Sequence, residues 1–478
     1  MPQPLRVNPL LRTDSYKLTH FRQYPPDTEI VYSYLESRGG MFDRVVANPI
    51  LQYYLEAYLA GQVFTMRDVD EAREFALAHF GTDRCFNYGG WKNLFTKHQG
   101  RLPLRIRAIK EGEVVETHNA LVTVENTDPE FPWLTNWAET LLLKMWYPIT
   151  VATLSREIKQ VIGRALARTG DPADLPFKLH DFGYRGVSSE ESAAIGGAAH
   201  LLNFLGTDTM AAIELLQQYY GATMPGFSIP ASEHSTITSW GGPEQEQFAY
   251  KNMLDQYPEG LVACVSDSYD IQNAVEKIWG GVLRERVNGR PGVLVIRPDS
   301  GEPVQVLEDI FRAVEARFGL DDQHLGTKKG WKVLNPRVRV IQGDGVNYHT
   351  IQNITSQLTR KGWSQSNWGY GMGGALLQQL NRDTLRFAFK CSAIRRNGVW
   401  QDVYKAPKTD MSKASKGGRF VVVNNGRAFV TVPFSETVTV TSDRLETRFL
   451  DGEVVKRYTL DDLRATVAHY DDFKELAA

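Results

Sequence analysis

The sequence predicts an α/β fold: a closed or nearly closed barrel of parallel strands, together with a second, mainly antiparallel unit. Between residues 178 and 390, short apolar strands alternate with helical segments without a long break. Such alternation is typical of a parallel sheet. Each strand is followed by a cluster of polar residues or glycines, and after Lys390 the pattern changes to strands separated by turns such as Asn424-Asn425-Gly426.

The first 170 residues are predicted to mix helices with a small sheet. A short helix is expected after Thr13 or Asp14, and a strand at 31–37 ends in the turn Arg38-Gly39-Gly40. Apolar residues recur at helical spacing over 46–80, which predicts helices there. An antiparallel sheet is predicted over 102–124, and apolar helices are predicted at 133–146 and 153–167.

The barrel is predicted from seven strand–helix units. The strands are 178–182, 203–206, 226–230, 261–265, 292–296, 338–341 and 368–370. The last unit is expected to continue into a helix at 375–383. Sites in such barrels are built from the loops after the strands. We therefore expect a group of residues to lie together at the end of the barrel where the strands finish: Arg185, Asp208, His234, Asp267, Arg297, Asp299, Asp344, Gly373 and Gly374.

The C-terminal part is predicted to be a second, antiparallel unit that can share a sheet with residues 102–124. Its expected strands are 389–394, 399–404, 419–423, 428–432, 437–440 and 446–450.

Composition limits the class of protein. The chain has 478 residues, 42% of them hydrophobic, and a net charge of -2, which is ample for a large core and argues against nucleic-acid binding. Its three cysteines are far apart, which fits a reducing compartment and excludes a thiolate zinc site. No signal core and no run of about 18 apolar residues occurs, so we expect a cytoplasmic protein without a membrane span.

The stretch Lys178–Ser189 combines a ring, a guanidinium and two glycines at a strand-to-helix transition. Phe182 can stack on a flat heterocycle, and Arg185 can bind a phosphate through two parallel hydrogen bonds. Ser188 or Ser189 can cap the following helix. The alternative interpretation is a sharp turn with a half-buried Phe and a surface Arg.

Two glycine-rich strand ends indicate an anion site. Gly343–Gly345 and Gly371–Gly374 would direct free N–H groups at a phosphate, and the alternative is helix capping with close packing. Arg382, eight residues after Gly374, could reach the same phosphate. A second, more highly charged group could be bound by Arg185, Arg297 and Lys390 with the lysines Lys405, Lys408, Lys413 and Lys416, although a lysine cluster is often only a solvated loop.

Acidic residues and a histidine complete the candidate chemistry. Asp267, Asp299 and Asp344 could hold ribose hydroxyls, or Mg²⁺ through water. His234 could act as an acid, a base, a phosphate ligand or a phospho-acceptor, or be structural. Asp14 and Tyr16 alone would be explained by capping and surface packing.

One motif supports a different class of enzyme. Gly369–Gly374 fits the dinucleotide pattern GxGxxG, and the next strand ends in Arg395-Arg396, as an NADP dehydrogenase would require. The motif lies last in the strand–helix series instead of first, which counts against this alternative. Asp181-Phe182-Gly183 is the kinase tripeptide, but no His-Arg-Asp loop accompanies it.

Longer motifs resemble the nicotinamide phosphoribosyltransferase branch of the type II phosphoribosyltransferase family. They are residues 13–17, 125–129, 133–137, 146–153, 178–189, 206–209, 233–238, 266–271, 296–301 and 342–346. The resemblance implies an irregular (β/α) barrel over 1–34, 130–150 and 178–390, and a peripheral α+β domain over 35–129, 151–177 and 391–478. It implies transfer of a phosphoribosyl group from phosphoribosyl pyrophosphate to nicotinamide, giving nicotinamide mononucleotide and pyrophosphate in NAD salvage.

The resemblance also implies roles for individual residues. Phe182, Asp208 and Arg297 would bind nicotinamide, with Tyr16 stacking from the partner subunit of a homodimer. Asp208 would accept a hydrogen bond from the carboxamide and repel nicotinate. The ribose and 5′-phosphate would be held by Asp299, Gly343, Asp344, Gly373, Gly374 and Arg382. Pyrophosphate would face Arg185, His234, Arg297, Arg38, Lys390, Lys405 and Lys413. Asp14 and Asp267 belong to the same motifs.

The catalytic residues implied are His234, Arg297 and Asp299, with Mg²⁺ accompanying phosphoribosyl pyrophosphate and ATP phosphorylating His234. Met372, Ala375 and Asn347 depart from the family pattern, which affects phosphate-loop detail and ATP coupling. Two competing readings stay open: transfer onto nicotinate, and a non-catalytic nucleotide-sensing module.

Overall fold

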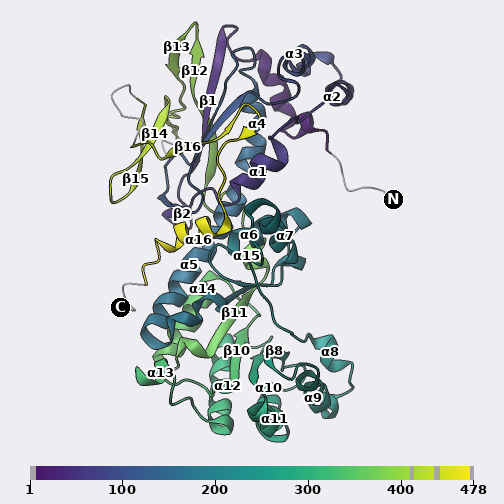
Figure 1. Cartoon of the computed structure of the whole chain (residues 1–478), viewed down its shortest axis with the longest axis vertical. Coiled ribbons are helices and arrows are strands. Elements are labelled where there is room, and N and C mark those ends of the chain that lie inside the picture. Colours follow the sequence, from purple (N-terminus) through teal and green to yellow (C-terminus); the bar gives the residue numbers. More distant parts are fainter. Residues whose placement is uncertain (1–6, 410–413, 435–441, 474–478) are drawn as a thin grey trace. The chain divides into compact units, whose positions relative to one another are not determined.

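The computed structural model describes residues 7–409, 414–434 and 442–473. Its internal contacts divide the chain into two compact units (Figure 1). Unit 1 comprises Met1–Thr153 and Asn381–Val467, and unit 2 comprises Leu154–Leu380 and Ala468–Ala478. No helix in the described part of the chain is long and apolar enough to cross a membrane.

Unit 2 is built on a curled parallel sheet. Its strands are β6 (Leu179–Asp181), β7 (Gly206–Thr207), β8 (Gly260–Val265), β9 (Gly292–Arg297), β10 (Val338–Gln342) and β11 (Trp368–Met372). They lie in the order β7-β6-β11-β10-β9-β8, and every neighbouring pair is parallel. Short apolar strands alternating with helices produce this arrangement, as the sequence predicts.

An irregular segment joins the two edges of this sheet. Phe227 forms a parallel bridge with Gly206 of β7, and Ala231 forms one with Ala263 of β8. The N–H of Thr207 donates to the Phe227 carbonyl (3.0 Å), and the N–H of Ser232 donates to the Ala263 carbonyl (3.0 Å). Pro230 has no N–H to donate, which helps to explain why no regular strand forms here. With segment 226–232 between β7 and β8, the strands form the nearly closed barrel that the sequence predicts.

Helices follow the strands of unit 2. They are α6 (Glu190–His200), α7 (Met210–Tyr220), α8 (His234–Thr238), α9 (Glu246–Gln256), α10 (Ile271–Asn273), a π-helix (Ala274–Val282), α11 (Arg284–Gly289), α12 (Pro303–Phe318), α13 (Leu325–Lys328), α14 (Tyr348–Arg360) and α15 (Gly374–Leu377). Ser189 caps α6 by accepting from the N–H of Ser192 (3.1 Å), as predicted.

The prediction of a helix over 375–383 is wrong in its length, because α15 ends at Leu377. The Asn381 side chain accepts hydrogen bonds from the N–H groups of Asp383 (2.8 Å) and Thr384 (3.0 Å). A local turn of this kind competes with helix formation, and it redirects the chain into β12.

Unit 1 contains a seven-stranded sheet in the order β13-β12-β1-β5-β3-β16-β17. These strands are β1 (Thr28–Ser37), β3 (Leu104–Ile109), β5 (Val122–Asn126), β12 (Phe387–Arg396), β13 (Val399–Asp402), β16 (Leu445–Leu450) and β17 (Glu453–Val454). Two strands of segment 102–124, β3 and β5, therefore share a sheet with C-terminal strands. Two further ladders pair β2 (Arg44–Val46) with β4 (Val114–Glu116) and β14 (Phe420–Asn424) with β15 (Phe429–Pro433). The strand predicted at 437–440 lies outside the described residues.

The helices of this part of the chain are α1 (Leu51–Tyr58), α2 (Met66–Phe80), α3 (Tyr88–His98), α4 (Leu134–Leu143) and α16 (Leu460–Ala468), with a 3-10 helix at Ser15–Arg22. Helix α5 (Trp146–Thr169) continues into unit 2. The compact units differ in part from the predicted domains. Residues 1–34, 130–150 and 381–390 were predicted in the barrel domain and lie in unit 1. Residues 154–177 were predicted in the peripheral domain and lie in unit 2. The antiparallel pairing of β1 with β5 and β12 accounts for the first difference.

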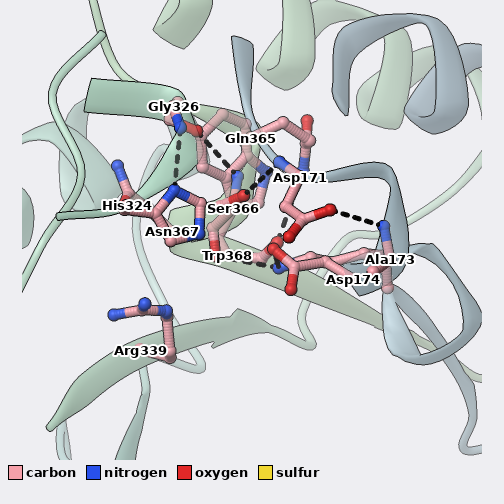
Figure 2. A network of polar contacts seen from close by, with 12 residues as sticks. Asp171, Ala173, Asp174, His324, Gly326, Arg339, Gln365, Ser366, Asn367 and Trp368 are labelled. Atoms are coloured by element: carbon pink, nitrogen blue, oxygen red, sulfur yellow. Dashed lines mark hydrogen bonds and ion pairs between the residues drawn. The ribbon is translucent and has the colours of Figure 1, made fainter. Parts of the chain in front are cut away.

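A polar network fills the end of the barrel where the strands begin (Figure 2). The ammonium group of Lys178, directly before β6, donates to the Ser366 carbonyl (2.8 Å) and lies 3.8 Å from the Asp174 carboxylate. Arg339 donates to the carbonyls of Asn335 and Val338, both at 2.8 Å. Burial lowers the pKa of Lys178 to about 8.

Lys178 should make stability depend on alkaline pH. Its ordinary pKa is 10.5 and its folded value is about 8. Between these values the unfolded chain binds more protons, so the free energy of unfolding rises with pH. The free energy of unfolding of the wild type, compared with that of Lys178→Met, should rise by up to ~3 kcal/mol between these two pH values. Denaturant unfolding at a series of pH values measures the difference, and a flat difference would contradict it.

Candidate active site

A cavity of about 930 Å³ opens where the barrel strands end. Four predicted site residues line it: Phe182, Arg185, Asp208 and Arg297. They follow β6, β7 and β9, so the parallel sheet brings together residues that are more than 100 positions apart in the chain. The cavity brings together three residues of the predicted mouth, Arg185, Asp208 and Arg297, and Phe182 lies with them.

The ring of Phe182 occupies the space that a side chain at position 371 would need. A Cβ built on Gly371 would lie 1.9 Å from Cε2 of Phe182, so no other residue fits there without moving the ring. The N–H of Phe182 donates to the Met372 carbonyl (3.0 Å), which attaches the turn to the end of β11. A Cβ on Gly343 would lie 3.7 Å from the same ring. The aromatic face is therefore placed by two glycine-containing strand ends.

Asp208 presents an exposed carboxylate in the same cavity. The hydroxyl of Ser228 donates to its Oδ1, and its own N–H donates to the Asp181 carbonyl (2.9 Å). Burial lowers the pKa of neighbouring His180, so that imidazole is neutral at pH 7. Asp208 therefore keeps acceptor capacity for a ligand N–H group.

The two arginines of the cavity are electrostatically unsatisfied. Neither Arg185 nor Arg297 forms an ion pair with any residue that the structure describes. Nε of Arg297 is buried and has no hydrogen-bond acceptor. A buried donor without an acceptor is costly. An anionic ligand would supply the missing acceptor.

His234 lies between two carboxylates at the start of α8. Its Nε2 is 3.4 Å from Asp299 and 3.8 Å from Asp267, and its Nδ1 is 3.1 Å from the Ser268 hydroxyl. Asp267 also accepts hydrogen bonds from the N–H of Asp299 (2.9 Å) and the hydroxyl of Ser300 (2.5 Å). The imidazole is about half exposed, so it is held in orientation and can still reach a ligand.

The glycine-rich strand ends expose unused donors. The backbone N–H groups of Gly343, Asp344, Gly373 and Gly374 donate no hydrogen bond to any other described residue. The Asp344 carbonyl accepts from the Gln342 amide (2.9 Å), which shapes the first turn. Converging free N–H groups are what a phosphate requires. With only four residues, α15 adds little dipole to this arrangement.

A divalent cation would have few direct protein ligands here. The described residues include no group of three or more His, Cys, Asp or Glu side chains that could hold a metal ion. Asp267 does offer a buried Oδ1 without a hydrogen-bond partner. This donor set fits Mg²⁺ held mainly by water and substrate phosphates.

The other predicted residues belong to unit 1. Asp14 accepts a hydrogen bond from the Thr140 hydroxyl (2.6 Å), and Tyr16 is 57% exposed. Arg38 pairs with buried Glu36 (2.7 Å). Lys413 lies outside the described residues.

A cluster of cations in unit 1 contains Lys390 and three neighbours. Burial lowers the pKa of Lys390; Glu139 opposes this effect, and the positive charges of Arg38, Lys405 and Arg382 lower the pKa further. Among the described residues, the ion partner of Arg382 is its sequence neighbour Asp383, at 3.7 Å. Mutual repulsion of this kind is relieved when an anion binds.

The cavity is also lined by His180, Ser228 and Glu233, which are not among the predicted site residues. His180 precedes Phe182 by two residues on a strand, and residues two apart on a strand share a face, so this position could have been found. Ser228 could not be found in this way, because its segment forms no regular strand. Glu233 belongs to the motif at 233–238, from which no role was predicted for its side chain.

Comparisons with known proteins agree with this geometry. Residues 177–453 match the model of the nicotinate phosphoribosyltransferase (NAPRTase) family, and residues 8–106 match the N-terminal domain of nicotinamide phosphoribosyltransferase. The chain is 47% identical over 467 residues to a nicotinamide phosphoribosyltransferase of Xanthomonas campestris pv. campestris (strain 8004), covering 96% of this chain and 97% of the relative. It is 31% identical over 502 residues to one of Acinetobacter baylyi, covering 98% and 99%.

Solved structures share the fold. A nicotinate-nucleotide pyrophosphorylase from Pyrococcus furiosus has a TM-score of 0.61 at 13% identity, covering 99% of both chains. Human nicotinic acid phosphoribosyltransferase has a TM-score of 0.56 at 15% identity, covering 98% of this chain and 96% of that one. The barrel, the match over more than half of the chain and the close relatives lead to one conclusion: the chain belongs to the nicotinate phosphoribosyltransferase family.

Proposed function

We propose that this protein transfers the phosphoribosyl group of phosphoribosyl pyrophosphate to nicotinamide, giving nicotinamide mononucleotide and pyrophosphate for NAD salvage. The observation that carries the proposal is the single cavity that holds an aromatic ring, a carboxylate and two unpaired arginines. These groups match the flat ring, the amide N–H groups and the phosphates of the two substrates. The names of the relatives support the same substrate.

Phe182 and Asp208 would bind and orient the base. The nicotinamide ring stacks on Phe182, and its carboxamide NH₂ donates to Asp208. The ring nitrogen then forms a bond to C1 of the ribose while the bond from C1 to the pyrophosphate oxygen breaks. No covalent intermediate with the protein is needed, because positioning and charge stabilisation lower the barrier to an oxocarbenium-like transition state.

Cations and backbone donors would bind the charged parts of phosphoribosyl pyrophosphate. Arg185 and Arg297 receive the pyrophosphate, whose negative charge grows as it leaves. The free N–H groups of the glycine-rich turns at Gly343 and Gly373 receive the 5′-phosphate. Asp267 and Asp299 would help to hold Mg²⁺ through water, and the ion would supply positive charge for the leaving pyrophosphate.

Residues of unit 1 would complete the site from the partner subunit of a homodimer. The exposed Tyr16 would cover the second face of the nicotinamide ring. The cation cluster of Arg38, Lys390 and Lys405 would add positive charge for pyrophosphate. The enzyme would act in the cytoplasm.

ATP would couple to this reaction through His234. In this step a ring nitrogen of His234 forms a bond to the γ-phosphorus, the bond to the β-phosphate oxygen breaks, and ADP leaves; water later removes the phosphoryl group. The two carboxylates and Ser268 hold the ring for this attack.

The dehydrogenase alternative receives no support from the geometry. A dinucleotide site needs its glycine motif at the start of a full helix. Helix α15 has four residues, and Gly371 of the motif packs against Phe182 instead of leaving space for a pyrophosphate.

Asp208 should decide between nicotinamide and nicotinate. In single-turnover product analysis with phosphoribosyl pyrophosphate and Mg²⁺, the wild type should form mononucleotide from nicotinamide and little from nicotinate. Asp208→Asn should lower kcat/KM for nicotinamide roughly 10- to 100-fold, because a charge-assisted hydrogen bond is weakened, and should reduce the discrimination against nicotinate. No mononucleotide from either base would refute the proposed activity.

Gly371→Ala should displace the Phe182 ring, since the new methyl group would overlap it. We expect KM for nicotinamide to rise roughly tenfold or more through lost stacking. Steady-state kinetics measures this effect. Gly289→Ala is the matched control, because its Cβ meets no atom within 4 Å. Equal KM values for both variants would contradict the assigned role of the ring.

His234→Ala should abolish protein labelling by γ-phosphate-labelled ATP and remove the stimulation of turnover by ATP. The expected label is acid-labile and base-stable, as a phosphoramidate is. The exposed His469 provides the control variant His469→Ala, which should keep the label. Undiminished labelling of His234→Ala would exclude the phosphohistidine route.

A further inference from the structure

Asp181 is a buried carboxylate directly behind the cavity lining, and the proposed chemistry does not use it. It is the last residue of β6 and directly precedes Phe182, and its side chain has no exposed surface. Burial raises its pKa to about 6, so it is mostly ionised at neutral pH. No cation in the described part of the chain forms an ion pair with it.

Stability alone does not explain such a residue. Burying a carboxylate without a cationic partner costs free energy. Two glycines leave the room it needs: a Cβ on Gly183 would lie 3.0 Å from Oδ1, and a Cβ on Gly197 would lie 3.1 Å from Oδ2. The surrounding structure is therefore shaped to accept this group, and its hydrogen bonds indicate what it does there.

The hydrogen bonds of Asp181 lead to both nicotinamide-binding loops. Its Oδ1 accepts from the N–H of Gly183 (2.7 Å), the residue after Phe182. Its main-chain carbonyl accepts from the N–H of Asp208 (2.9 Å). Its Oδ2 accepts from the hydroxyl of Thr207 at 3.5 Å, the long limit for a hydrogen bond.

Thr207 is in turn hydrogen-bonded to Thr209, the residue that follows Asp208. The Oγ1 of Thr207 itself accepts from the N–H of Thr209 (2.9 Å). The residues on either side of Asp208 are thereby tied to the same carboxylate that holds the turn after Phe182. One side chain thus connects the turn that carries the aromatic ring with the turn that carries the amide acceptor.

We propose that Asp181 is a positioning residue that sets the separation between the Phe182 ring and the Asp208 carboxylate, and thereby the selection of nicotinamide. The proposal rests on the proposed function and deepens it. Loss of the carboxylate removes the hydrogen bond to the turn after Phe182 and the contact with Thr207 beside Asp208, while the main-chain bond from Asp208 remains. The stacked ring and the amide acceptor then no longer fit one ligand together. Among the phosphate-binding groups, Arg297 and the glycine-rich turns at Gly343 and Gly373 lie on other strand ends and keep their geometry. Arg185 follows β6, beyond the turn that Asp181 holds through Gly183.

The first test is Asp181→Asn, which keeps the volume but replaces one acceptor oxygen by a donor. We expect KM for nicotinamide to rise about tenfold or more, and the preference for nicotinamide over nicotinate to fall by a similar factor. KM for phosphoribosyl pyrophosphate should change less than about threefold. Glu308→Gln is the matched control: it alters another buried carboxylate of unit 2, paired with Arg312 and Lys361, and should change thermal stability without changing either KM.

Thr207→Val tests the same connection if Asp181→Asn folds poorly, because it removes only the hydroxyl. It should raise KM for nicotinamide in the same direction by a smaller factor. Combining Asp208→Asn with whichever of the two variants folds should give less than the product of the single effects, since each disturbs the same contact.

The outcomes separate this inference from the function on which it rests. A folded Asp181→Asn enzyme with unchanged KM and unchanged base preference would overturn the positioning role while leaving the transferase intact. Equal losses for both substrates would also overturn it, because they would indicate general destabilisation. A wild-type enzyme that forms no mononucleotide would overturn the proposed function and this inference together.

Discussion

The candidate site depends on the parallel pairing of the barrel strands. Parallel strands finish at the same edge of their sheet, so whatever follows each strand is delivered to one place. β9, β10 and β11 pair in this way, and β6 and β7 continue the series. The irregular segment 226–232 then joins β7 to β8, which brings Ser228 against Asp208. A single antiparallel strand in this series would direct its loop to the opposite end.

Charge is distributed differently in the framework and in the site. The framework contains a fully buried ion pair between Arg448 and Glu111 at 2.7 Å, in which both side chains have 0% exposure. Arg185 and Arg297 have no ion partner among the described residues, and Lys390 in unit 1 is surrounded by other cations. Unpaired charges reduce the stability of the free protein, and an anionic ligand bound to them would offset that cost.

Glycine acts in this site mainly by leaving space. Gly371 makes room for the Phe182 ring, and Gly183 and Gly197 make room for the Asp181 carboxylate. At Gly343 and Gly373 the same absence of a side chain lets a ligand approach free backbone N–H groups. The departures at Met372 and Ala375 leave these contacts intact, because Met372 is buried within β11 and contributes its main-chain carbonyl.

The sequence by itself determined the local patterns and the family. Strand–helix alternation, the polar strand ends and the Ser189 cap depend on residues close together in the chain, and the long motifs identify the relatives. Only the tertiary structure decided which distant residues meet. The closing of the barrel by an irregular segment, the early end of α15, the contact of Phe182 with Gly371 and the position of Asp181 between two loops all depend on residues many positions apart. Periodicity carries no information about such contacts, because each is set by how the strands pair and how much space their side chains leave.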